Sequence, residues 1–329
     1  MIKAIETVLK QFEQSDLSEK ARLEYAIGQL LPICDQIPHP AKGQTFLRWQ
    51  ILAQVAASNL NLVKWFESHL DALSILHDLQ YSGAKSGLWA VWAAEGSPQP
   101  LTFEHAQCTG LKNWCSGANL VDHGLMTYKD ENNQSQLLIV NMHEQGIDIR
   151  QTGWHALGMQ YTETRAVYFE QVKAEKVGKP NGYLNRVGFW HGAAGIAACW
   201  FGATLHLANY LTEAAKKNPN DFKQMYLGEV ITAVQTTRQF FYALALKIDE
   251  APHLSHELDI RILRAQTEST AEIILKNVGK ALGARPYCED KQFAQLSTDL
   301  PVFLRQSHAA FDLKRIGELT LEESNVWQL

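Results

Sequence analysis

The period of the hydrophobic pattern changes twice along the chain, and this limits the possible folds more than any other feature. Residues 1–87 and 179–329 repeat apolar side chains at the three- and four-residue spacing of helices, whereas residues 88–178 contain short apolar runs separated by glycines and an acidic turn. We therefore predict three domains with these boundaries. They are an N-terminal helical domain of about four helices, a small antiparallel middle β-barrel or sandwich, and a C-terminal bundle of long helices. The predicted fold class is α+β, mostly α.

The composition is that of an ordinary globular protein and excludes several classes of partner. The 329 residues are 46% hydrophobic and 20% charged, and 30 basic against 35 acidic residues give a formal net charge of −5. This balance argues against a nucleic-acid-binding protein. The longest apolar stretch, Ala193–Leu211, carries Thr204, His206 and Asn209 and falls short of the roughly 20 apolar residues of a membrane span. We expect no membrane span.

The cysteines and histidines suggest neither a disulfide scaffold nor a metal site. No Cys-x-x-Cys pair occurs, and the histidines do not cluster at metal-ligand spacing. The N-terminal segment also lacks the apolar core of a signal peptide. We therefore predict a reduced, cytoplasmic protein without a metal. The five scattered cysteines are Cys34, Cys108, Cys115, Cys199 and Cys288.

Three strings occur in order along the second and third sections. Residues 110–118 read GLKNWCSGA, residues 158–172 read GMQYTETRAVYFEQV, and residues 185–197 hold NR followed by GAAGIA. Taken alone, each string is also compatible with an ordinary hairpin or helix. In this order, and with helices on both sides of a β section, they resemble the acyl-CoA dehydrogenases. The resemblance covers about residues 80–320 and implies the fold predicted above.

The resemblance implies a flavin cofactor. Its ring needs a flat apolar wall and hydrogen-bond donors near its reactive edge. By resemblance, Trp114, Cys115 and Ser116 line the flavin, with Trp114 as the wall, and Ala94 lies in a shortened version of a second flavin-binding loop. Arg285 stands where it could meet a phosphate. FAD is implied, but the family's arginine and two glycines for the adenosine half are missing, so FMN stays open.

The catalytic glutamate of the family is absent from both positions where members carry it. One position aligns with Gln306 or Ser307 and the other with Asn185, and neither offers a carboxylate to accept a proton. His308 and Asp312 instead lie four residues apart, on one face of a helix, where such a pair can tune a proton-transfer group near neutral pH. A structural His–Asp bond explains the spacing equally well. We take Gln306, His308 and Asp312 as candidate catalytic residues.

Three functions remain open. The resemblance favours a flavin-dependent oxidoreductase of the class that oxidises CH–CH bonds, acting on a small molecule such as an acyl thioester, with His191 in the substrate pocket. Such a dehydrogenase would pass its electrons to an electron acceptor. A monooxygenase of the same fold would instead take reduced flavin from a flavin reductase. A catalytically silent homologue would only bind flavin or another ligand. Because the family completes its cofactor sites with a neighbouring subunit, the apolar helices 222–248 and 258–282 indicate a homodimer or homotetramer.

Overall fold

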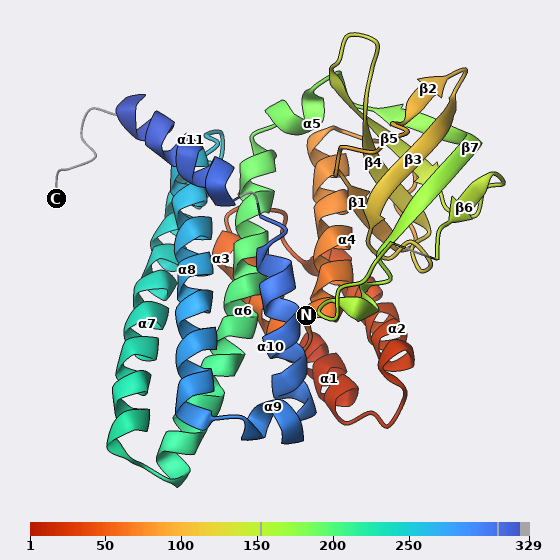
Figure 1. The fold of residues 1–329 in the computed structure, drawn as a ribbon. Helices are drawn as coiled ribbons and strands as arrows, with labels where there is room; N and C mark the ends of the chain where they lie inside the picture. The colour runs from red at the N-terminus through yellow and green to blue at the C-terminus, as the bar shows by residue number, and fades with distance from the viewer. Residues whose placement is uncertain (152, 308, 323–329) are drawn as a thin grey trace. The chain divides into compact units, whose positions relative to one another are not determined.

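The computed structural model describes residues 1–151, 153–307 and 309–322 (Figure 1). Helices come first, then strands, then helices again, as the hydrophobic pattern predicts. The first group comprises α1 (Ile2–Glu13), α2 (Glu19–Leu30), the 3₁₀ helix η1 (Leu31–Gln36), α3 (Thr45–Ser58) and α4 (Leu60–Asp78). The strands are β1 (Trp89–Trp92), β2 (Thr102–Glu104), β3 (Gln107–Cys115), β4 (His123–Lys129), β5 (Ser135–Asn141), β6 (Ile147–Ile149) and β7 (Arg165–Val177), with η2 (Gln160–Thr162) before β7.

The last group holds the longest helices. It comprises α5 (Gly182–Asn185), α6 (Gly188–Lys217), α7 (Asp221–Glu250), α8 (Glu257–Leu282), α9 (Arg285–Glu289), α10 (Lys291–Leu304) and α11 (Ala309–Glu322). Over the described residues, none of these helices or those before the sheet is long and apolar enough to cross a membrane. The predicted fold class is confirmed.

The strands of the described residues form one seven-stranded sheet in the order β1-β4-β5-β7-β3-β2, with β6 also paired to β7. The long strand β7 pairs with β3 from Arg165 to Lys173 and with β5 from Ala174 to Val177, so this one strand connects the two groups of strands. The expectation of a wholly antiparallel sheet was wrong for one pair, because β1 runs parallel to β4. The chain leaves β1, forms β2 and β3 on the far side of the sheet, and returns in the same direction.

By packing, the chain divides into two compact units that do not follow chain order. One unit comprises residues 1–39, 61–156 and 160–189, and the other comprises residues 40–60, 157–159 and 190–329. The core of the first unit forms where α4 packs against the sheet. Its shared apolar residues are Ala72, Ile75, Leu76, Trp89, Leu125, Leu137, Ile139 and Val177.

Close backbone contacts in the second unit explain two of its glycines, one of which opens the second string. A Cβ at Gly202 of α6 would lie 2.1 Å from the carbonyl oxygen of Ala53 in α3, so α6 needs small residues where it crosses α3. A Cβ at Gly158 would lie equally close to the carbonyl oxygen of Thr298 in α10. Next to it, the Met159 N–H donates to the buried carboxylate of Asp299 at 2.5 Å. Gly202 and Gly158 therefore mark places where two backbones touch.

Candidate functional site: an exposed tryptophan and a cavity beside α8

Trp114 stands out from the end of β3. The pairing of β3 with β7 shifts register between Lys112 and Cys115, and Trp114 adopts a left-handed backbone conformation with φ of 57°. Such a bulge turns the following side chain away from the regular alternation of the strand. The indole is 63% exposed, while the adjacent Cys115 is buried in the core of the first unit. The sequence thus builds a flat apolar wall that the chain itself leaves open.

The segment after Trp114 is joined to the second string by a ladder of hydrogen bonds. The Gly117 N–H donates to the carbonyl of Thr162 at 2.8 Å, and the Ala118 N–H donates to the carbonyl of Glu163 at 3.2 Å. The half-buried Ser116 hydroxyl lies 2.9 Å from the Thr164 hydroxyl. The structure therefore brings the first and second strings together, beside Trp114.

A buried lysine supports this corner from inside. The Nζ atom of Lys112 donates to the carbonyl oxygen and the hydroxyl of Thr127, at 2.6 and 3.0 Å. Burial lowers the pKa of Lys112, although the nearby charge of Glu95 opposes the shift. Burial also raises the pKa of the Cys115 thiol, so this side chain is a neutral core group. Only the backbone of Cys115 remains to meet a ligand.

Glu95 and Glu163 are both held by neighbouring groups. One oxygen of Glu95 accepts from the Thr127 hydroxyl at 2.5 Å and lies 3.5 Å from Lys112, next to the half-buried Ala94. Burial raises the pKa of Glu163, but the hydrogen bond from Asn119 and the charges of neighbouring cations lower it to a net value below the ordinary one.

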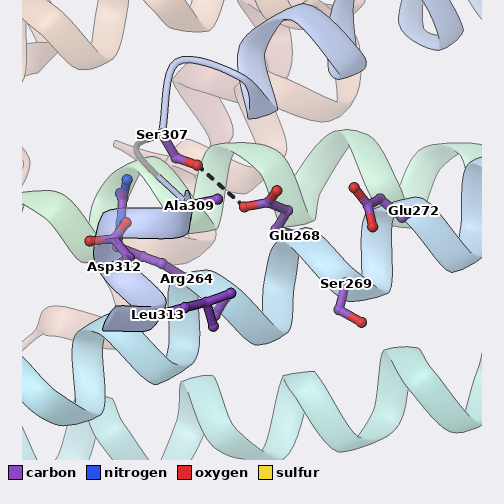
Figure 2. A pocket seen from close by; sticks show the side chains of 9 residues that line it. Arg264, Glu268, Ser269, Glu272, Ser307, Ala309, Asp312 and Leu313 are labelled. Carbon is purple, nitrogen blue, oxygen red and sulfur yellow. Dashed lines mark hydrogen bonds and ion pairs between the residues drawn. The ribbon is translucent and has the colours of Figure 1, made fainter. Parts of the chain in front are cut away.

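The second unit contains a cavity of about 240 Å³ between α8 and the segment that leads into α11 (Figure 2). Two of its lining residues are joined, because the Ser307 hydroxyl donates to Glu268 at 3.2 Å, and Glu268 is only 13% exposed at its side chain. Arg305 pairs with Glu268 and with Glu272 of the next helical turn. The lining residues are Arg264, Ala265, Glu268, Ser269, Glu272, Ser307, Ala309, Asp312 and Leu313.

Of the described candidate catalytic residues, Asp312 lines this cavity and Gln306 is not among its lining residues. The Asp312 carboxylate pairs with Arg261 and lies 4.0 Å from Arg264. Gln306 is exposed, and its backbone N–H donates to the carbonyl of Phe303 at 3.1 Å. His308 lies outside the described residues, so its proposed pairing with Asp312 stays a prediction.

The other two candidates have partners of their own. Arg285 is 81% exposed at its side chain and donates to Glu289 at 2.6 Å, at the start of α9. His191 is buried in α6, with Nε2 2.9 Å from the carbonyl oxygen of Leu254 in the connection between α7 and α8. Roles in phosphate binding for Arg285 and in the substrate pocket for His191 stay predictions.

Sequence reasoning missed Thr164 and Glu268. Thr164 is inside the second string, but its contact with Ser116 depends on how β3 pairs with β7, which no local pattern reveals. Glu268 lies in the middle of a long helix and reads as an ordinary solvated position. Within the described ranges, no group of three or more histidine, cysteine or acidic side chains could hold a metal ion.

Comparison with solved structures identifies the architecture. TdsC from Paenibacillus sp. A11-2, crystallised with FMN and indole, matches over 97% of this chain and 95% of that chain, with 14% identity and a TM-score of 0.76. Butyryl-CoA dehydrogenase from Megasphaera elsdenii matches over 97% and 94%, with 13% identity and a TM-score of 0.75.

This chain has the acyl-CoA dehydrogenase fold. The 3-HSA hydroxylase from Rhodococcus sp. RHA1 shares it over 99% of this chain and 96% of that chain, with 10% identity and a TM-score of 0.77. No protein-family model matches the sequence, and no curated protein matches it. At these identities the likeness establishes the fold, which hosts both dehydrogenases and a hydroxylase among the matched structures.

Proposed function

We propose that this protein is a flavin-dependent oxidoreductase with FAD or FMN as its cofactor. The observation that carries the proposal is Trp114, a large apolar ring that is 63% exposed on a left-handed backbone position. A globular protein gains nothing in stability by holding an indole in this way, whereas a flat ring ligand would cover it. Ser116, two residues on, offers a hydroxyl beside this wall.

The residues present are better suited to bind the ring of a flavin than its phosphate. Trp114 would stack on the ring, while Ser116 and the backbone at Cys115 and Ala94 would supply hydrogen bonds. Arg285 is already paired with Glu289, so only part of its guanidinium remains for a phosphate. FMN or a loosely held FAD suits this distribution, and the similar TdsC was crystallised with FMN. When bound, the flavin would accept or donate electrons for a small-molecule substrate.

A monooxygenase is the second candidate. It is favoured by the lack of a carboxylate at positions 185, 306 and 307, because an oxygenase does not need the base that removes a proton from an acyl thioester. One structure of the same fold is named as a hydroxylase. On this view His308, Asp312 and Gln306 serve the substrate, His191 lines its pocket, and a separate reductase supplies reduced flavin. A dehydrogenase would need an electron acceptor instead.

We also propose that the protein assembles as a homodimer or homotetramer in the cytoplasm. The helix α7 exposes several large apolar side chains that a second copy would cover, and four of the five free cysteines are buried thiols. The exposed apolar residues of α7 are Phe222, Met225, Ile231, Tyr242 and Leu246.

Titration of the purified protein with FMN and with FAD tests the cofactor, read as quenching of flavin fluorescence. Trp114→Ala is the site variant, and Tyr25→Ala, which removes another exposed aromatic ring, is the control. We expect binding by the wild type and the control and weakened binding by Trp114→Ala. If neither flavin is quenched by the wild type, the proposal is wrong.

The two reactions are then separated with the loaded protein. A dehydrogenase would bleach its oxidised flavin on anaerobic addition of an acyl thioester from a panel of chain lengths. A monooxygenase would leave that flavin oxidised and would convert an aromatic substrate such as indole when given reduced flavin and oxygen. Flavin binding with neither reaction would leave the silent homologue as the remaining function.

A further inference from the structure

Three hydroxyl groups form a chain that runs from the core of the first unit out to Ser116. The Thr162 and Thr164 hydroxyls lie 2.7 Å apart, and the Thr164 and Ser116 hydroxyls lie 2.9 Å apart. Both threonines are buried, with Thr164 only 3% exposed, whereas Ser116 is half-buried at the outer end. This chain of hydroxyl groups therefore links the solvent-excluded interior of the first unit to Ser116, near Trp114.

Thr164 limits what the Ser116 hydroxyl can present to the outside. Each hydroxyl has one hydrogen to donate and two lone pairs to accept. If Thr164 donates to Thr162, Ser116 must donate to Thr164, and its outward side can only accept. If Thr164 donates to Ser116, the hydrogen of Ser116 is free to point outward. Hydrogen bonds in such a chain polarise one another, so its direction is set cooperatively.

The backbone around Ser116 is held by bonds that do not involve the Thr164 hydroxyl. The Ser116 carbonyl accepts from the indole N–H of Trp92 at 3.0 Å. The Thr162 carbonyl accepts from the indole N–H of Trp65 and from the Gly117 N–H, both at 2.8 Å. Removing the Thr164 hydroxyl should therefore change the hydrogen-bonding state of Ser116 and leave its position nearly unchanged.

We propose that Thr164 is a positioning residue that sets whether Ser116 donates to or accepts from the edge of the flavin ring. This inference rests on the proposed flavin site. The ring edge is an acceptor when the flavin is oxidised and carries an N–H when it is reduced. A hydroxyl chain that favours one direction favours one oxidation state. Thr164 thereby tunes the relative affinity of the site for reduced and oxidised flavin.

The test compares Thr164→Val, which removes the hydroxyl at nearly constant shape, with Thr164→Ser, which keeps it. Thr204→Val is the control, because Thr204 is equally buried but donates to the carbonyl of Trp200 within α6. The measurements are the dissociation constants of oxidised FMN and FAD, from fluorescence, and the midpoint potential of the bound flavin, from equilibration with a redox dye.

We expect Thr164→Val to bind flavin but to change the ratio of the two affinities by about fivefold, the size of one net hydrogen bond. For a two-electron couple this is a shift of about 20 mV, because a tenfold change is about 30 mV. Thr164→Ser should restore the wild-type midpoint, and Thr204→Val should not move it.

An unchanged midpoint in flavin-loaded Thr164→Val would overturn the inference, as would a shift that Thr164→Ser shares. Should Thr164→Val not fold, Ser116→Ala provides the decision, since it removes the outer hydroxyl from a half-buried position. It must shift the midpoint if the chain acts on the ring, and an unshifted midpoint refutes the inference. Failure of the wild type to bind any flavin refutes the proposed function instead.

Discussion

Replacing Trp114 by alanine and by glycine separates the two unusual properties of this residue, its exposed ring and its left-handed backbone. Both variants remove the indole and should weaken flavin binding equally. They differ only in a Cβ atom, which is strained at the φ of 57° that this position adopts. Trp114→Gly should therefore be more stable than Trp114→Ala although both bind flavin equally poorly.

The exposed fraction of the ring gives the expected size of the binding effect. A tryptophan that is 63% exposed leaves about 150 Å² of surface open, if its full surface is about 250 Å². A ring ligand that covers half of this area gains about 2 kcal/mol at about 25 cal/mol per Å². Loss of the indole should then weaken flavin binding about 30-fold, because about 1.4 kcal/mol corresponds to tenfold.

The backbone effect is smaller and has a fixed sign. The left-handed conformation costs a non-glycine residue about 1–2 kcal/mol, and glycine loses about 0.5–1 kcal/mol more chain entropy on folding. Trp114→Gly should therefore exceed Trp114→Ala by about 0.5–1 kcal/mol in the free energy of unfolding. Urea denaturation of the flavin-free variants measures this difference.

Gln80 provides the control, because it is exposed and also left-handed, with φ of 56°, at the end of α4. Gln80→Gly should be more stable than Gln80→Ala by a similar amount and should bind flavin like the wild type. Wild-type flavin affinity in Trp114→Ala would refute the stacking argument. A Trp114→Gly variant no more stable than Trp114→Ala would refute the argument from backbone strain.

Three further predictions concern acid stability, substrate and assembly. Burial lowers the pKa of His69 to about 4, against an opposing charge from Asp35, so the unfolded state binds more protons between pH 6.5 and 4 and stability falls as the pH falls through this window. Between pH 7 and pH 5 the free energy of unfolding should fall by about 2 kcal/mol. Urea denaturation should show no such fall in His69→Asn, and parallel pH curves for the two proteins would contradict the prediction. Wild-type protein should show little or no dye reduction with short, medium or long acyl-CoA thioesters, whereas Gln306→Glu or Ser307→Glu gains turnover, and robust wild-type turnover would show that the base was misplaced. Light scattering at micromolar concentration should give a multiple of the monomer mass, and a monomer would refute the proposed assembly.

The alternation of helix, strand and helix was predictable because it depends on local spacing of apolar residues. Which strands become neighbours was not, since β1 and β4 are separated by β2 and β3 and nothing near Trp89 or His123 encodes their parallel pairing. Pairing is decided by the whole sheet, and the same holds for the site. Trp114 and Ser116 could be identified from their string, whereas Thr164 became visible only once β3 was seen beside β7.

Buried polar residues were the second kind of feature that the sequence concealed. Charged side chains are rarely buried unless paired, so nothing in the sequence indicates that Lys112 and Asp299 are buried. In the structure Lys112 donates hydrogen bonds to Thr127 and Glu95, and Asp299 accepts a hydrogen bond from the backbone N–H of Met159. Thr127, Glu95 and Met159 are 15 to 140 residues away from these charged groups along the chain, and no local pattern reports such contacts.

The cavity beside α8 changes what a restored glutamate would do. The Ser307 hydroxyl donates a hydrogen bond to Glu268. A carboxylate at position 307 would remove this hydrogen bond and place a second negative charge against Glu268. Two carboxylates this close cannot both ionise freely, and one pKa rises strongly. A carboxylate at position 306 would be exposed beside Arg305, which already balances Glu268 and Glu272. If Ser307→Glu gains turnover, its rate should therefore rise only at a higher pH than that of Gln306→Glu, and identical pH profiles would show that Glu268 does not act on this position.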